Sequence, residues 1–173
     1  GPAVDNVSMD EEAERTMFRL AGIALSIGLV LSWFCLRSFR LVAMVFFAGI
    51  YALALSVAIV PLTGNTMNAI LMTMPPLVYV AAISAAIHLT NYYRDSAAEH
   101  GLVGAAERAL RHGALPLGLA TATTAIGLVS LCTSELVPIQ MFGTFSAIGV
   151  VASLLVLCLF LPACFAVWPL PAV

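Results

Sequence analysis

The feature that most constrains how this chain can fold is its long absence of charge. Between Leu41 and Tyr93 the sequence contains no Asp, Glu, Lys or Arg, and between Ala114 and Val173 it contains only Glu135. A soluble domain carries about 25% charged residues, whereas this chain carries 9% and is 62% hydrophobic. Apolar segments of about 20 residues cross a bilayer as helices, because each helix satisfies its own backbone groups. We therefore predict an all-α integral membrane protein.

Turn residues divide the apolar sequence into five predicted membrane spans. These spans cover about residues 17–36, 41–62, 66–93, 114–134 and 139–167. The third span is longer than the about 20 residues that a bilayer requires. Pro75 and Pro76 lie inside it, and proline removes a backbone donor and disfavours helical geometry in the residue before it. A kink or a broken turn is therefore expected there.

The longest polar connection, residues 94–113, follows the third span. Within it Ala105, Ala109, Glu107 and Arg108 alternate at helical spacing, which predicts an amphipathic helix at about 98–112 on the membrane surface. Residues 1–15 form an acidic lead-in, and residues 16–173 are expected to form one transmembrane domain. The fold class predicted is thus five transmembrane helices plus one cytoplasmic amphipathic helix.

The arginines between the spans predict the orientation of the chain. Five of them fall on one side of the predicted bundle: Arg37, Arg40, Arg94, Arg108 and Arg111. The other side has only two, embedded among acidic residues. Because loops rich in Lys and Arg stay in the cytoplasm, the end at residue 1 is expected outside and the C-terminal end inside.

Three polar side chains near the end of the third span share one helical face. Ser84, His88 and Asn91 are spaced i, i+4 and i+7, which places them on one side of a helix. Ionisable groups in membrane helices are usually functional, because lipid does not replace their hydration. His88 either is a neutral group bonded to a neighbouring helix or to headgroups, or it faces the bundle interior and takes part in proton or substrate passage. Thr121 and Thr124 of the fourth span are expected opposite this face.

Small residues on the last two spans predict close contact between helices. Gly143 and Ala147 have the small-xxx-small spacing that lets membrane helices approach one another. Gly118, Ala122 and Gly127 are the corresponding small residues of the fourth span. We expect all five to lie at helix contacts.

No catalytic or metal-binding pattern accompanies the polar face. The sequence has no HExxH, GxxxxGK[ST], GxSxG or paired CxxC motif. Its four cysteines lie in apolar runs at spacings typical of neither a disulfide framework nor a zinc site, so we expect packing roles for them. All seven basic residues are arginines and none forms a cluster, which argues against nucleic-acid binding. We expect no enzymatic activity, no metal and no cofactor.

The order of these elements resembles one half of a transporter of the resistance-nodulation-division (RND) superfamily. The resemblance covers nearly the whole chain and rests on PPLVYVAAISAAIHLTNYYRD, AAERAL, ATATTAIGLVSL, FGTFSAIGV and LFLPACF. It looks closest to the branch of mycobacterial large membrane proteins (MMPL), hopanoid exporters and Patched-like sterol-sensing proteins. A half-transporter of this family has six helices, with a large extracytoplasmic domain between the first two. The resemblance implies that this chain is helices two to six, entered from the end of that outer domain.

The resemblance also implies a function, with one departure. Proton-driven members usually carry an Asp-Tyr pair in the fourth helix, where this chain has Ser84 and Ala85. Either a second half holds the proton site, or His88 substitutes, or the protein is not proton-driven. The expected function is outward transport of hydrophobic or lipid-like molecules across the inner membrane on the proton gradient. The alternative is a sterol-sensing-like module that binds lipid and regulates a partner without pumping. Expected partners are membrane lipids, the substrate, and a second half of the same polypeptide or a second copy.

Overall fold

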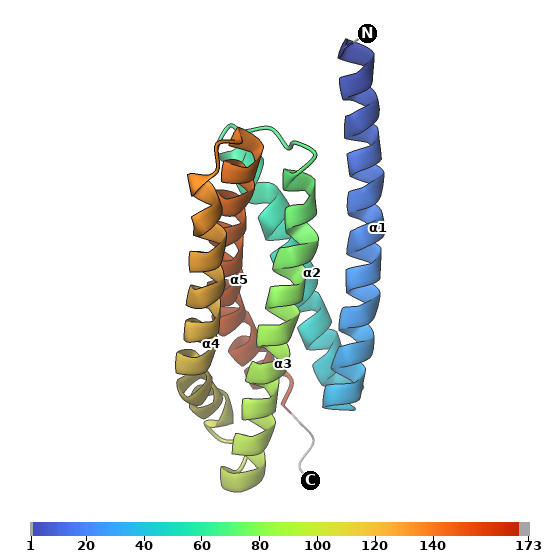
Figure 1. Ribbon diagram of the computed structural model, residues 1–173. Coiled ribbons are helices and arrows are strands. Elements are labelled where there is room, and N and C mark those ends of the chain that lie inside the picture. The colour runs from blue at the N-terminus through green and yellow to red at the C-terminus, as the bar shows by residue number, and fades with distance from the viewer. Residues whose placement is uncertain (1, 170–173) are drawn as a thin grey trace.

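The computed structural model describes residues 2–169 and forms an up-and-down bundle of five long helices (Figure 1). The helices are α1 (Pro2–Leu36), α2 (Phe39–Leu62), α3 (Met74–His100), α4 (Ala105–Val129) and α5 (Val137–Val167). Two short 3₁₀ turns, η1 (Leu71–Thr73) and η2 (Ser130–Thr133), precede α3 and follow α4. Each of the five helices is long and apolar enough to cross a membrane. The predicted all-α membrane fold is confirmed.

The amphipathic surface helix expected at about 98–112 is not a separate element. Helix α3 continues to His100, and α4 begins at Ala105 and runs without interruption into the fourth span. Ala105 and Ala109 are fully buried against the bundle core. The small side chains that suggested a face toward the membrane surface instead pack against α3. The polar connection thus shrinks to the short turn between α3 and α4.

No kink forms inside α3 at the two prolines, whereas the break in the helix that was the other expectation lies just before them. Pro75 and Pro76 lie in the first turn of α3, where the missing backbone donors would have had no helical partner. The regular helix accordingly begins at Met74, and the candidate membrane span begins at Leu71 rather than near residue 66. The residues before it form a loop and the turn η1, in which the Asn68 side chain accepts a hydrogen bond from the Leu71 amide at 2.8 Å.

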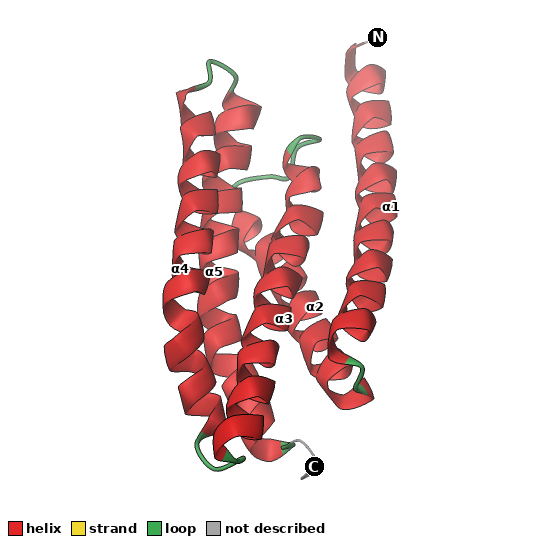
Figure 2. Ribbon diagram, turned by 60° about the horizontal axis from the view of Figure 1, so that its bottom comes forward, coloured by secondary structure: helices red, strands yellow, loops and turns green. Residues whose placement is uncertain are grey.

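Helix α3 is the centre of the bundle. It packs against α1, α2, α4 and α5, and it has the largest buried share of the five spans. Around it α1 contacts α2, α2 contacts α5, and α5 contacts α4. Among the described residues α1 makes no contact with α4, and Figures 1 and 2 show these two helices on either side of α3. The four outer helices therefore leave one side of α3 uncovered.

A buried tyrosine fixes α3 against α1 and α2. Tyr79 is fully buried, and its hydroxyl donates to the Leu25 carbonyl at 3.5 Å. A Cβ at Gly28 of α1 would lie 2.7 Å from that hydroxyl, and a Cβ at Gly49 of α2 would lie 2.7 Å from the ring. Two glycines on facing helices therefore create the space that the ring fills.

Two contacts fix the opposite end of α3. Tyr93 stacks on Phe165 of α5, with ring centroids 4.1 Å apart and an interplanar angle of 4°. The Arg94 guanidinium donates to the Cys35 carbonyl in the last turn of α1 at 3.2 Å. Carbonyls in a last helical turn have no partner within the helix, and a cation there is favourable with the helix dipole. The end of α1 is thereby tied to α3.

Candidate functional site

The uncovered side of α3 carries the predicted polar face. Val80 is 55% exposed, Ser84 and His88 are exposed, and Asn91 is half-buried. One turn further on, Asp95 is exposed on the same side. We call Ser84, His88, Asn91 and Asp95 the polar stripe. These residues share one side of α3 because they recur every three or four residues. The stripe forms a polar surface in the gap that α1 and α4 leave open.

The structure therefore does not place this face inside the five-helix bundle. Ser84 and His88 lie on its surface, whereas Ala82, Ala86 and Leu89 of the same helix form the core side. The predicted polar interior is thus not formed within this chain. The role of the face in transport stays a prediction.

The threonines expected opposite the face make contacts with their own helix. Thr124 is exposed, and its hydroxyl donates to the Ala120 carbonyl at 2.9 Å. Thr123 donates to the same carbonyl at 2.9 Å. Thr121 is half-buried. Among the described residues no hydrogen bond joins these threonines to Ser84 or His88, and their place opposite the polar face stays a prediction.

The small residues proposed for helix contacts behave in two ways. Gly143 and Ala147 of α5 are buried, and a Cβ at Gly143 would lie 2.5 Å from the Leu128 carbonyl oxygen. Helices α4 and α5 thus touch through backbone at this point. A Cβ at Gly118 or Gly127 would meet nothing within 4 Å. Ala122 and Gly127 are exposed and Gly118 is half-buried, and these residues do not share one face of α4, because Gly118 and Gly127 lie on opposite sides of the helix. Gly118 and Gly127 therefore make no close helix contact with the described residues of this chain.

Buried serines are the polar residues that the sequence reasoning missed. Ser56 of α2 and Ser153 of α5 are buried and bond carbonyls of their own helices. Ser146, two turns before Ser153, is fully buried, and its hydroxyl has no hydrogen-bond partner among the described residues. The signal that could have found them is the seven-residue spacing of the two α5 serines within an otherwise apolar helix.

The site offers proton-exchanging chemistry at only one membrane-embedded position of the stripe. His88 carries its one imidazole, a group that proteins use for proton exchange, and the nearest carboxylate on the same side of α3 is Asp95, about two turns toward the helix end. Among residues 12 and 14–169, no three His, Cys, Asp or Glu side chains are grouped so that they could hold a metal ion. The stripe therefore suits hydrogen bonding or proton exchange with a partner surface.

Comparison with known proteins agrees with this architecture. Residues 1–168 match the MMPL family. The chain is 31% identical over 169 residues to the Streptomyces coelicolor protein named "Putative membrane protein SCO0839". That alignment covers 94% of this chain but 24% of the relative, so the chain spans about a quarter of the length of the relative it matches.

Proposed function

Because the chain belongs to the MMPL family, a family of membrane transporters, we propose that it is part of the membrane domain of an RND-type exporter. The exporter would move hydrophobic or lipid-like molecules outward and would use the proton gradient. Five spans of the expected length supply the permease part of such a machine. The relative it matches is about four times longer, so the chain is proposed as one part of the transport unit.

The observation that carries this proposal is the uncovered polar side of the central helix. Ser84, His88 and Asn91 would face hydrocarbon if this side of α3 met lipid, and unsatisfied polar groups in hydrocarbon cost free energy. A second half of the same polypeptide, or a second copy, would cover them. The stripe would then lie between two bundles, where water and protons can be admitted without exposure to lipid.

The chemistry of the stripe limits what this half contributes. Ser84 and Ala85 stand where proton-driven relatives carry the Asp-Tyr pair, and neither side chain exchanges a proton near neutral pH. In the proposed mechanism the covering half supplies the carboxylate at the depth of Ser84. His88, one turn from Ser84 on the same side of α3, would exchange a proton or a hydrogen bond with it. In this mechanism the change of charge at the interface would shift the helices of the two halves relative to one another.

Reconstitution of the full-length protein tests this function. Efflux of a fluorescent lipid from proteoliposomes is measured with and without an imposed proton gradient. The proposal expects flux to require the gradient and to fall severalfold in His88→Gln. A matched control is His100→Gln, which changes an exposed histidine in the last turn of α3. Lipid efflux that does not depend on the gradient would refute proton coupling. Efflux at the wild-type rate at all pH values in His88→Gln would refute the role of this residue.

A second candidate function is favoured by the missing carboxylate. A sterol-sensing-like module binds lipid between helices and regulates a partner, and it needs no proton carrier at Ser84. The full-length sequence separates the two functions. A second copy of the helical pattern with Asp or Glu at the position of Ser84 supports the exporter. A cytoplasmic signalling domain in its place supports the sensor.

The proposed orientation rests on the arginines. The turn between α1 and α2 and the turn between α3 and α4 lie at the same end of the bundle, together with the end of α5 (Figure 1). This end carries five of the seven arginines, whereas the other two, Arg15 and Arg19, lie near the beginning of the α1 membrane span Glu14–Leu36. We place the arginine-rich end in the cytoplasm and the beginning of α1 outside the inner membrane. Reaction of a single introduced cysteine at Val103 with an impermeant maleimide in intact cells would contradict this orientation.

A further inference from the structure

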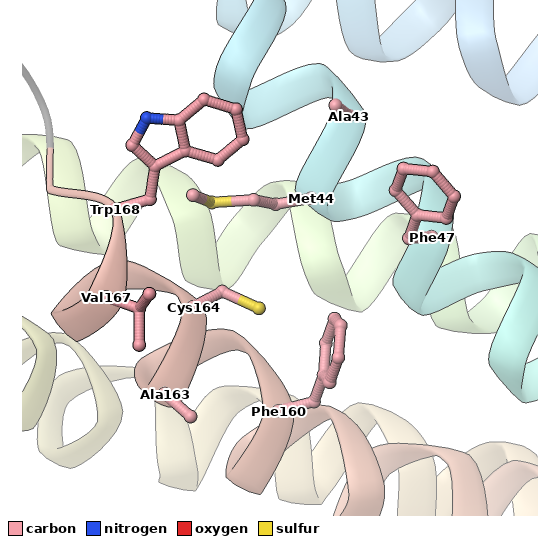
Figure 3. Close-up of a pocket in the computed structure, with 8 residues that line it drawn as sticks. All are labelled: Ala43, Met44, Phe47, Phe160, Ala163, Cys164, Val167 and Trp168. Atoms are coloured by element: carbon pink, nitrogen blue, oxygen red, sulfur yellow. The ribbon is translucent and has the colours of Figure 1, made fainter.

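A second surface feature lies on the far side of α2 from α1, between α2 and α5. An apolar groove of about 380 Å³ is lined by side chains of both helices (Figure 3). Helix α2 contributes Ala43, Met44 and Phe47, which share one face. Helix α5 and Trp168, the residue that follows it, line the other side through these residues: Phe160, Ala163, Cys164, Val167 and Trp168. The volume lies within the range of about 300–1,000 Å³ that is usual for ligand sites.

One end of the groove has the chemistry of the membrane–water interface. Figure 3 shows the Trp168 indole at this end, with Phe47 and Phe160 toward the other. The Arg40 guanidinium lies over the Trp168 ring, 5.4 Å from its centroid. Arg40 precedes Ala43 and Met44 by three and four residues, so it continues the groove-lining face of α2. Tryptophan gathers at headgroup depth, and a cation held on a ring is fixed in place.

Arg40 has no acidic partner among the described residues. The two ion pairs there are His100 with Glu99 and Arg111 with Glu107. A second exposed cation, Arg37, lies three residues earlier. Apolar lining and unneutralised positive charge at one end therefore make a single amphipathic site.

We propose that this groove binds one acyl chain of an anionic phospholipid from the adjacent leaflet, with the lipid phosphate at Arg40. Basic pockets between membrane helices are the surfaces that bind anionic headgroups, and the apolar lining matches hydrocarbon. A packed helix would leave the Arg40 charge without a counterion unless it carried an acid at that depth, whereas a lipid supplies both parts at once. The site is separate from the polar side of α3, because it lies between the other two contact partners of that helix.

Photo-crosslinking in nanodiscs tests the site in the full-length protein. Phosphatidylglycerol with a diazirine on its acyl chain is compared with the matching phosphatidylcholine, and labelled peptides are mapped by mass spectrometry. The proposal expects labelling of the α2 and α5 peptides that line the groove to be stronger with phosphatidylglycerol. Arg40→Gln should reduce this labelling about fivefold, the effect of one arginine near an anionic surface. Arg111→Gln is the control, because it removes an exposed arginine outside the groove.

A second pair of variants tests the groove itself. Ala163→Phe fills it from an exposed position and should reduce labelling by both lipids, whereas Ala166→Phe, exposed on α5 outside the lining, should not. Equal labelling by the two lipids would overturn the proposal. So would wild-type labelling in Arg40→Gln or Ala163→Phe. A photoreactive reagent attached to Cys164 provides a further check. If it crosslinks to another protein segment rather than to lipid, a helix occupies the groove, and the proposal is overturned as well.

Discussion

At the scale of single residues, the space around Tyr79 is a tight constraint on the core. Its ring fills the volume that Gly28 and Gly49 leave between three helices. The sequence marks Gly28 as a small residue in a membrane span, but it does not show which ring it faces. That information comes only from the approach of α3 to α1 and α2.

Gly49→Ala is expected to destabilise the protein by about 1–3 kcal/mol, the usual cost of overpacking a core. The added Cβ would lie 2.6 Å from Ile83 Cδ1 and 2.7 Å from the Tyr79 ring. The matched control is Gly22→Ala, whose Cβ meets nothing within 4 Å. That change should be neutral or stabilising, because alanine favours a helix over glycine by about 1 kcal/mol. Thermal unfolding in detergent checks both, and equal melting temperatures would contradict the tight packing.

The polar face shows how far residue patterns can predict a site. The spacing of Ser84, His88 and Asn91 predicts correctly that they share one side of α3. It does not say whether that side faces the core, because any face of a central helix can be covered. Whether the polar side is buried can be decided only when the helices that pack against α3 are known.

At the scale of elements, the contact between α4 and α5 depends on one glycine. Gly143→Ala is expected to cost about 1–3 kcal/mol, because its Cβ would lie 2.5 Å from a backbone oxygen that has no freedom to move away alone. Gly127→Ala, at an exposed position of α4, is the control and should not destabilise. Thermal unfolding of the two variants measures the difference. A loss at Gly127 instead would mean that its face is packed against another segment.

The turn between α3 and α4 is held by one arginine. Arg108 donates to Ser96 Oγ at 2.8 Å, to the Val103 carbonyl at 2.9 Å and to the Gly101 carbonyl at 2.9 Å. Only a guanidinium reaches three acceptors in this geometry, so this connection is ordered by side-chain contacts. The sequence pattern around Arg108 fits a surface helix equally well, and this is why that element was wrongly predicted.

Arg108→Lys should therefore loosen this turn by about 1.5–3 kcal/mol, the range for hydrogen bonds made by a charged group. Hydrogen exchange at residues 101–104 should speed up, while exchange in the centre of α3 should not change. Arg111→Lys is the matched control, since Arg111 makes only an exposed pair with Glu107, worth little. Unchanged exchange in Arg108→Lys would show that the turn is held by its backbone alone.

At the scale of the whole molecule, the sequence predicts the number of spans better than their packing. Apolar runs of about 20 residues define five helices, because each helix must be apolar where it crosses the bilayer. The same apolarity removes the contrast between inner and outer faces that identifies the core of a soluble bundle. The central place of α3, the open side between α1 and α4, and the groove between α2 and α5 could therefore be found only from the structure.

Whether the open side of α3 is covered by protein or faces lipid can be measured. Spin labels are placed at Ser84→Cys and at Leu155→Cys in a variant without the four native cysteines. Leu155 is 62% exposed on α5 and should meet lipid, where dissolved oxygen is abundant. If a second bundle covers the stripe, a label at Ser84 is shielded and relaxes several times less with oxygen. Equal relaxation at both positions in the full-length protein would place the polar stripe against lipid, and would remove the interface on which proton coupling was proposed.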